Sequence, residues 1–185
     1  EGTTAQRANP FLAAGRDGDN DRARPILEED RDVATFDAFT AATCSLPDHI
    51  AAFVARDPAI VHSTRGGKGW TPLMYLSQSA MHLRGEKFAA APERCAEILL
   101  GAGADPNLGT GLAEDRQAHL PALFRAAMLG NVGVVRQLLK AGADPNDDES
   151  VYHAAEQNQR ECLELLLAHG ALLDGRPGSR WNNTP

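Results

Sequence analysis

A short segment of this chain recurs along the sequence, and this recurrence limits the possible folds more than any other feature. Residues 99–107 read LLGAGADPN, residues 138–146 read LLKAGADPN, and residues 166–171 read LLAHGA. A segment that copies itself at a period of roughly 33 residues is one supersecondary unit stacked on others, because one unit cannot bury its own apolar face. The repetition therefore predicts a stack of similar units, and such stacks bind other molecules more often than they catalyse reactions.

Two helices are predicted ahead of each recurring segment. In residues 121–139, apolar side chains fall at helical spacing in two groups, with Gly130 and Asn131 between them. The small pair Ala126 and Ala127 leaves room for neighbouring helices to approach closely. The expected buried stripe of the second helix is Val134, Val135, Leu138 and Leu139. Each unit is therefore expected to be a helix, a tight turn and a second helix.

The same template covers the chain with about five units in a single all-α domain, residues 1–185. The first unit is expected to open at Asn9 and Pro10, and Thr71 is expected to cap the first helix of the third. Gly142 is expected to end a second helix, because glycine adopts the left-handed conformation without steric cost. The units are 9–35, 36–66, 67–107, 108–146 and 147–174, and residues 175–185 begin a further unit or form an irregular cap.

These motifs resemble the ankyrin-repeat family, whose pattern is Gly-x-Thr-Pro-Leu, then Ala-Ala, then Leu-Leu-x-x-Gly-Ala-Asp-Pro-Asn. The match is fullest over residues 69–107 and 121–146 and weaker over residues 1–66. The resemblance implies an all-α solenoid with projecting hairpin fingers and a protein-binding role. The chain departs from the pattern at Asp30 and Asp57, which stand where later units carry glycine, so the second unit is expected to close differently. The histidine that usually follows Thr-Pro-Leu is replaced by Met74, Phe124 and Tyr152.

The spacing of the repeats locates two insertions and one deletion. Gly103 and Gly142 lie further apart than one period, so residues 108–119 are expected to form an enlarged finger. Gly142 and Gly170 lie closer than one period, so residues 147–149 are expected to form a shortened one. Extra residues around 80–92 are expected to lengthen the first helix of the third unit or the turn after it.

In ankyrin repeats the partner usually binds a concave surface made of finger tips and the exposed face of the first helices. Trp70, Met128 and Leu129 are expected to face solvent there, and exposed aromatic anchors commonly carry binding energy. The alternative is that Trp70 folds over its own hairpin and that Met128 and Leu129 pack beneath the long finger. The candidate partner-binding residues that the resemblance implies are Trp70, Gln78, Ser79, Met128, Leu129, Glu156, Gln157 and Trp181.

An acidic run and the overall charge bear on the choice of partner. Asp144, Asp147, Asp148 and Glu149 either attract a basic partner or form a solvated turn. The chain has 18 Lys and Arg against 25 Asp and Glu, a net charge of −7, which disfavours nucleic acid. No apolar run is long enough to span a membrane. The expected partner is therefore another protein, bound by a monomer.

The cysteines favour a reducing compartment. Cys44, Cys95 and Cys162 are odd in number and far apart in sequence, so they are expected to be small core residues rather than disulfide partners. The expected location is the cytoplasm. Secretion or a periplasmic location stays open because the chain begins at Glu1, and the Ala-, Arg- and Asp-rich composition hints at a bacterial source.

No catalytic residue, cofactor or metal site is predicted. The six histidines form no His-x-x-x-His pair, and the sequence has no Cys-x-x-Cys, no Gly-x-Ser-x-Gly and no phosphate-binding Gly-Lys-Ser or Gly-Lys-Thr. The leading interpretation is a non-enzymatic protein-interaction module. The first alternative is a regulatory or inhibitory, immunity-type protein that blocks a partner enzyme with the long finger. A weaker alternative is an enzyme with an unrecognised site.

Overall fold

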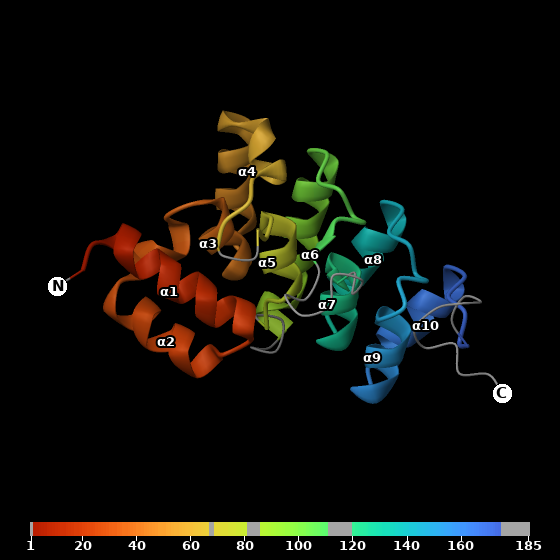
Figure 1. The fold of residues 1–185 in the computed structure, drawn as a ribbon. Helices are drawn as coiled ribbons and strands as arrows, with labels where there is room; N and C mark the ends of the chain where they lie inside the picture. The colour runs from red at the N-terminus through yellow and green to blue at the C-terminus, as the bar shows by residue number, and fades with distance from the viewer. Residues whose placement is uncertain (1, 67–68, 81–85, 111–119, 175–185) are drawn as a thin grey trace. The chain divides into compact units, whose positions relative to one another are not determined.

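The computed structural model describes residues 2–66, 69–80, 86–110 and 120–174, and α1 to α10 follow one another along the chain (Figure 1). The chain divides into two compact units, Glu1–Asp105 and Pro106–Pro185. Both are built from paired helices, as the repeats predict.

The first unit is a stack of three helix pairs. Its helices are α1 (Thr4–Asp17), α2 (Asn20–Glu29), α3 (Ala38–Thr43), α4 (Pro47–Arg56), α5 (Pro72–Ser77) and α6 (Glu86–Gly101). Two short 3-10 helices, η1 (Arg31–Thr35) and η2 (Pro58–His62), follow α2 and α4. Each helix packs on its pair partner, and α1 packs on α3, α3 on α5 and α4 on α6. Like helices therefore lie against like helices along the stack.

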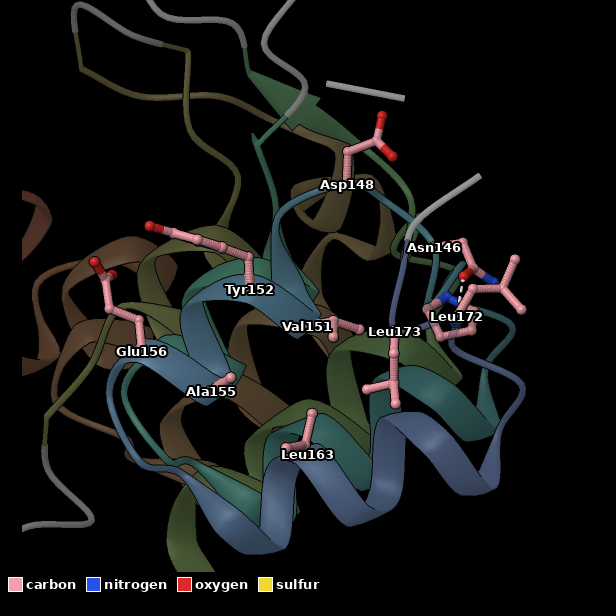
Figure 2. Close-up of a pocket in the computed structure, with 10 residues that line it drawn as sticks. Asn146, Asp148, Val151, Tyr152, Ala155, Glu156, Leu163, Leu172 and Leu173 are labelled. Carbon is pink, nitrogen blue, oxygen red and sulfur yellow. Dashed lines mark hydrogen bonds between the residues drawn. The ribbon is translucent and has the colours of Figure 1, made fainter. Parts of the chain in front are cut away.

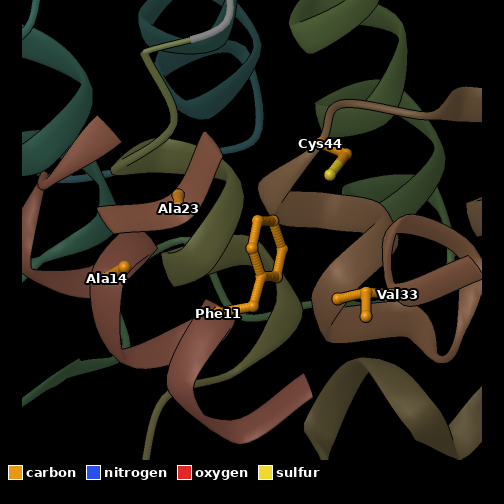
Figure 3. Packing of buried hydrophobic residues seen from close by; sticks show 5 residues of the cluster. All are labelled: Phe11, Ala14, Ala23, Val33 and Cys44. Atoms are coloured by element: carbon orange, nitrogen blue, oxygen red, sulfur yellow. The ribbon is translucent and has the colours of Figure 1, made fainter. Parts of the chain in front are cut away.

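A cluster around Phe11 forms the core at the start of this unit. The Phe11 ring lies between Ala14 and Ala23 on one side and Val33 and Cys44 on the other (Figure 3). These residues come from α1, α2, η1 and the end of α3, so the cluster joins the first helix pair to the second. Burial of these apolar groups stabilises the stack.

The second unit contains two more helix pairs and a hairpin. Strands β1 (Gly109–Thr110) and β2 (Leu120–Pro121) pair antiparallel, and α7 (Ala122–Met128), α8 (Val132–Lys140), α9 (Ser150–Glu156) and α10 (Arg160–Ala168) follow. Helix α7 packs on α9, and α8 packs on α10. The predicted stripe of Val134, Val135, Leu138 and Leu139 is buried, as are Ala126 and Ala127.

Helix α8 ends as predicted, at a left-handed glycine. Gly142 has φ +91°, its amide donates to the Leu139 carbonyl, and the Ala143 amide donates to the Leu138 carbonyl. Leu167 is 38% exposed, in contrast to its counterpart Leu139, because α10 is the last helix of the described residues and Leu167 lies on its outer side.

The first repeat differs from its expected start. Helix α1 begins at Thr4 rather than near Asn9, and Pro10 lies inside it. A capping box explains the earlier start: the Gln6 amide donates to Thr3 Oγ1, and the Thr3 amide donates to Gln6 Oε1. In the third repeat, Thr71 occupies the N-cap position, but its side chain makes no capping hydrogen bond within the described residues.

The insertion near residues 80–92 acts on the second helix of its pair. Helix α5 has 6 residues and is not lengthened, whereas α6 has 16 and begins at Glu86. By comparison, α8 has 9 residues. The extra residues therefore extend α6 at its N-terminal end and lengthen the connection between α5 and α6. The predicted longer turn is confirmed, and the alternative of a longer first helix is wrong.

The first and second repeats close with aspartate in an extended conformation. Asp30 has φ −144° and ψ 95°, and Asp57 has φ −146° and ψ 93°. Each carboxylate accepts a hydrogen bond from the amide two residues on, at 3.1 Å in both cases, and so caps η1 or η2. A 3-10 helix thus stands where later repeats use a left-handed glycine. The second unit closes differently from the later units, as expected, but the first unit closes in the same way as the second.

Candidate interaction surface

Trp70 is buried rather than exposed. Its side chain is 3% exposed and packs edge-on against Tyr75, with 5.3 Å between ring centroids. The backbones of Arg65 and Trp70 exchange two hydrogen bonds across a hairpin turn, and the Tyr75 hydroxyl donates to the Arg65 carbonyl at 3.2 Å. The expectation that Trp70 offers an exposed anchor is wrong, because the hairpin folds the indole onto α5. The burial of Trp70 agrees with the part of the alternative that folds this side chain away from solvent.

Ser79 is also buried, and it joins two repeats. Its hydroxyl donates to the Thr43 carbonyl at 2.9 Å and lies 3.4 Å from the Ser45 hydroxyl. This contact fastens the end of α5 to the end of α3. Ser79 therefore supports the stack instead of facing a partner, whereas the neighbouring Gln78 is half-buried.

Four other candidate residues are partly or fully accessible in the second unit. Met128 and Leu129 are half-buried at the end of α7, where Gln159 Nε2 donates to the Met128 carbonyl at 3.3 Å. Glu156 and Gln157 are exposed at the end of α9. The predicted packing of Met128 and Leu129 beneath the long finger involves residues 111–119, which lie outside the described residues. Trp181 also lies outside them.

His153 lies between the two helices that carry these residues. Its Nε2 is 3.2 Å from Glu149 Oε2, and its Nδ1 is 3.0 Å from Glu156 Oε2. The imidazole also packs against the Phe124 ring on α7 at 4.9 Å between centroids. The network orients the Glu156 carboxylate at the surface and holds α9 to α7.

The acidic run after the fourth repeat is half-buried at Asp144, Asp147 and Asp148 and buried at Glu149. Asp147 accepts hydrogen bonds from the amides of Glu149 and Ser150, at 3.0 and 2.7 Å, and thereby caps the start of α9. Burial raises the pKa of the Asp147 carboxyl above its ordinary value. The Asp144 carboxylate accepts from the Asn146 amide at 3.0 Å. These contacts make the run a structural turn, and Asp148 differs in lining a surface groove.

Arg125 holds the base of the long finger. Its guanidinium is 3.3 Å from Thr110 Oγ1 and 3.5 Å from the Leu120 carbonyl, so it bonds to both strands of the hairpin. Burial lowers the pKa of Arg125 to about 10, because a low-dielectric environment disfavours the charged form. The side chain is therefore a structural clasp between α7 and the hairpin.

A groove on the outer side of α9 and α10 was missed at the sequence level. It has a volume of about 540 Å³ and contains Val151 and Ala155 from α9 and Leu163 from α10 (Figure 2). The segment after α10 supplies Leu172 and Leu173, which are 49% and 70% exposed. Its other lining residues are Pro145, Asn146, Asp148, Tyr152 and Glu156. Among the predicted partner-binding residues that the structure describes, only Glu156 lines this groove.

Neither metal nor membrane features occur in the part of the chain that the structure describes. No group of three or more His, Cys, Asp or Glu side chains there could hold a metal ion. In the same residues, no helix has the length and apolar character needed to cross a bilayer. The three cysteines are buried, as predicted for small core residues, and no disulfide joins them.

The fold and its repeats define an ankyrin-repeat structure. Residues 87–176 match the family model for ankyrin repeats in three copies. The chain also resembles the ankyrin repeat domain of human ASB11, with a TM-score of 0.58 and 22% identity, over 74% of this chain and 55% of that one. Residues 87–176 thus match ankyrin repeats, and the fold of the chain is similar to that of an ankyrin repeat domain.

Two curated plant proteins are similar in sequence. E3 ubiquitin-protein ligase KEG of Arabidopsis thaliana is 38% identical over 80 residues, which are 40% of this chain and 5% of KEG. Probable E3 ubiquitin-protein ligase XBOS31 of Oryza sativa subsp. japonica is 27% identical over 157 residues, 82% of this chain and 31% of XBOS31. The chain therefore spans a small part of each relative. These relatives give no support to the bacterial source suggested by composition.

Proposed function

We propose that this chain binds a partner protein through the exposed face of its first helices, and that it does so without catalysis. One observation carries the proposal: α9 is buried along one side by α7 and α10, while Tyr152, Glu156 and Gln157 on its other side are exposed. A backbone held by repeat packing loses little conformational freedom on docking, so a modest set of contacts gives useful affinity. Gln157, Met128 and Leu129 form the face next to the turn between helices.

An affinity capture with the full chain tests this proposal. We expect a partner retained by the unmodified chain to be lost, by about tenfold or more, when Gln157→Lys and Met128→Ala are combined. Glu161→Lys on α10 is the matched control, because Glu161 is exposed away from that face. A partner retained equally by both variants contradicts binding through the face of the first helices.

The inhibitory alternative requires a different readout. It assigns the long finger, residues 108–119, to a partner enzyme's active site, and only residues 108–110 of that finger lie in the described structure. A captured enzyme whose turnover falls on addition of this chain supports inhibition. An enzyme whose turnover is unchanged supports a passive scaffold.

The plant relatives suggest where such a module could serve. Both carry the name of a ubiquitin ligase, and this chain corresponds to a part of each. We therefore propose substrate recruitment within a larger ligase as a second candidate. It predicts that the captured partner is ubiquitinated in cells and that this modification falls with the Gln157→Lys and Met128→Ala variant. A cytoplasmic location remains a prediction that fits either role.

A further inference from the structure

We propose that the groove on the outer side of α9 and α10 binds a segment of another protein that carries both apolar and positively charged residues. This inference deepens the proposed function, because it names a second surface and the chemistry of its ligand. The groove shares Tyr152 and Glu156 with the face of the first helices, but Ala155 and Leu173 line only the groove. Gln157 and Met128 do not line the groove, so variants at these four residues test the two surfaces separately.

The floor of the groove is apolar and comes from three segments. Val151 and Ala155 lie one helical turn apart on α9, Leu163 faces them from α10, and Leu173 reaches over α10 from the following segment (Figure 2). A volume of about 540 Å³ falls in the range of ordinary ligand sites and has room for several side chains. Such a floor suits the apolar face of a peptide that binds as a helix in a groove.

The wall of the groove is fixed in place by Asn146. Its Nδ2 donates to the Gly170 carbonyl at 3.1 Å, and its Oδ1 accepts from the Leu172 amide at 2.8 Å. The Ala171 amide also donates to the Leu166 carbonyl at 3.0 Å. These hydrogen bonds hold the backbone of residues 170–172 in place. Leu172 and Leu173 therefore stay exposed beside the groove. A preformed wall lowers the ordering cost of binding.

The rim determines the charge of the ligand. Asp148 and Glu156 both line the groove, and none of the lining residues within the described structure is Lys, Arg or His. Asp148 also has φ +70°, a conformation that asparagine tolerates well. Opposite charge across an interface favours association and suppresses partners of like charge. A segment with Lys or Arg beside its apolar residues therefore complements this rim, whereas an acidic segment is excluded.

A peptide selection on the full chain tests the assignment. A displayed library of random 12-residue peptides is selected against the chain, and the enriched peptides are synthesised for titration. We expect them to combine two or three large apolar residues with Lys or Arg. Ala155→Trp, which fills the groove from an exposed position, should weaken their binding by at least about tenfold. Ala168→Trp, at an exposed position outside the groove, should leave it unchanged.

Further variants separate charge, shape and folding. Asp148→Asn combined with Glu156→Gln should weaken the same peptides by about fivefold, and added salt should shrink that difference. Leu173→Ser removes part of the wall from a side chain that is 70% exposed, so loss of binding with unchanged thermal unfolding supports the groove even if Ala155→Trp folds poorly.

Several results overturn the proposal. They are the absence of any enriched peptide, enrichment of acidic peptides, and equal binding by Ala155→Trp and the unmodified chain. A dimer that Ala155→Trp converts to a monomer assigns the groove to a second copy instead. A tenfold gain in peptide affinity in the Trp181→Ala variant would mean that residues 175–185 of the chain compete with the peptide, and it would assign the groove to them. If the unmodified chain binds no peptide in the groove but still binds a partner through Gln157 and Met128, this inference alone is refuted. The reverse result refutes only the proposed function.

Discussion

Asn107 and Asn146 occupy equivalent positions in successive repeats and make the same pair of hydrogen bonds to the next repeat. Asn107 Nδ2 donates to the Gly142 carbonyl at 3.0 Å, and its Oδ1 accepts from the Asp144 amide at 2.8 Å. Asn146 does the same with the Gly170 carbonyl and the Leu172 amide, at 3.1 and 2.8 Å. Each Asn thus fastens its own loop to the residues that follow the next second helix, which is α8 for Asn107 and α10 for Asn146.

Replacement of that asparagine should loosen the last repeat. Asn146→Ala leaves the Gly170 carbonyl and the Leu172 amide without their partner, so we expect a loss of about 1 to 3 kcal/mol in the free energy of unfolding. Urea unfolding of the full chain measures this loss. Gln157→Ala, at an exposed position on α9, is the control and should change little. Equal stability of Asn146→Ala and the unmodified chain would contradict a bridging role.

Two adjacent alanines in α9 should respond very differently to arginine. Ala154 is fully buried, whereas Ala155 is exposed. Ala154→Arg overpacks the helix junction and buries a charge, so it should cost well over the roughly 1 to 3 kcal/mol of ordinary overpacking. Ala155→Arg should have a small effect on the melting temperature. Similar melting curves for the two variants would refute the register of α9.

Truncation of Trp70 should affect folding more than binding. Because the indole is buried against Tyr75, Trp70→Ala should cost about 3 to 5 kcal/mol, typical of removing a large buried aromatic group. Met128→Ala, at a half-buried position, serves as the comparison and should cost less. Chemical denaturation measures both. A stable Trp70→Ala protein with lost partner binding would restore Trp70 as a surface anchor.

Stability should depend on pH through Asp147. Burial raises the pKa of this carboxyl in the folded chain above its ordinary value of 3.8. The folded state therefore holds the proton to higher pH than the unfolded state does. The stability that this difference in proton binding contributes is fully present below pH 3.8 and is lost as pH rises through the pKa of the folded state.

A comparison with Asp147→Asn measures that contribution. The asparagine keeps an acceptor for the Ser150 and Glu149 amides but has no proton to lose. The unmodified chain should thus lose stability relative to the variant as pH rises above 3.8. If the difference in the free energy of unfolding between the two proteins stays constant with pH, or changes in the opposite direction, burial does not control the pKa of Asp147.

The buried thiols should be unreactive in the folded chain. Burial raises the pKa of Cys95 to about 12 and that of Cys162 to about 11, so little thiolate forms near pH 8. Thiol labelling at pH 8 should be slow in buffer and fast in denaturant. Rapid labelling of Cys162 under native conditions would place it outside the core of α10.

The repeat pattern predicts the helix pairs well because packing depends on it. Each unit needs small residues where helices pack closely, a large apolar residue in its second helix and a residue that ends that helix. These needs are met by Ala126 and Ala127, by Leu138 and by Gly142, so their spacing predicts their roles. The sequence pattern places Trp70 correctly on its hairpin, but it predicts an exposed side chain, whereas the side chain is buried. Its burial depends on how the hairpin folds onto Tyr75, and residue type alone does not determine that.

The groove escaped prediction for a different reason. Val151, Leu163 and Leu173 belong to three segments, and each looks like an ordinary core residue until the segments are assembled. The acidic run was likewise ambiguous, because hydrogen bonds turn the Asp147 carboxylate inward while Asp148 stays at the groove. A signal did exist in Asn146, which repeats Asn107 and indicates that residues 170–172 are held in place.

Amide hydrogen exchange on the full chain, with and without a captured partner, tests binding by this stack most directly. We expect slower exchange on partner binding in α9 and at the turn after α7, and little change in the last turn of α10 near Ala168. A partner that binds tightly yet leaves exchange in α9 and at Met128 and Leu129 unchanged would contradict binding through this face.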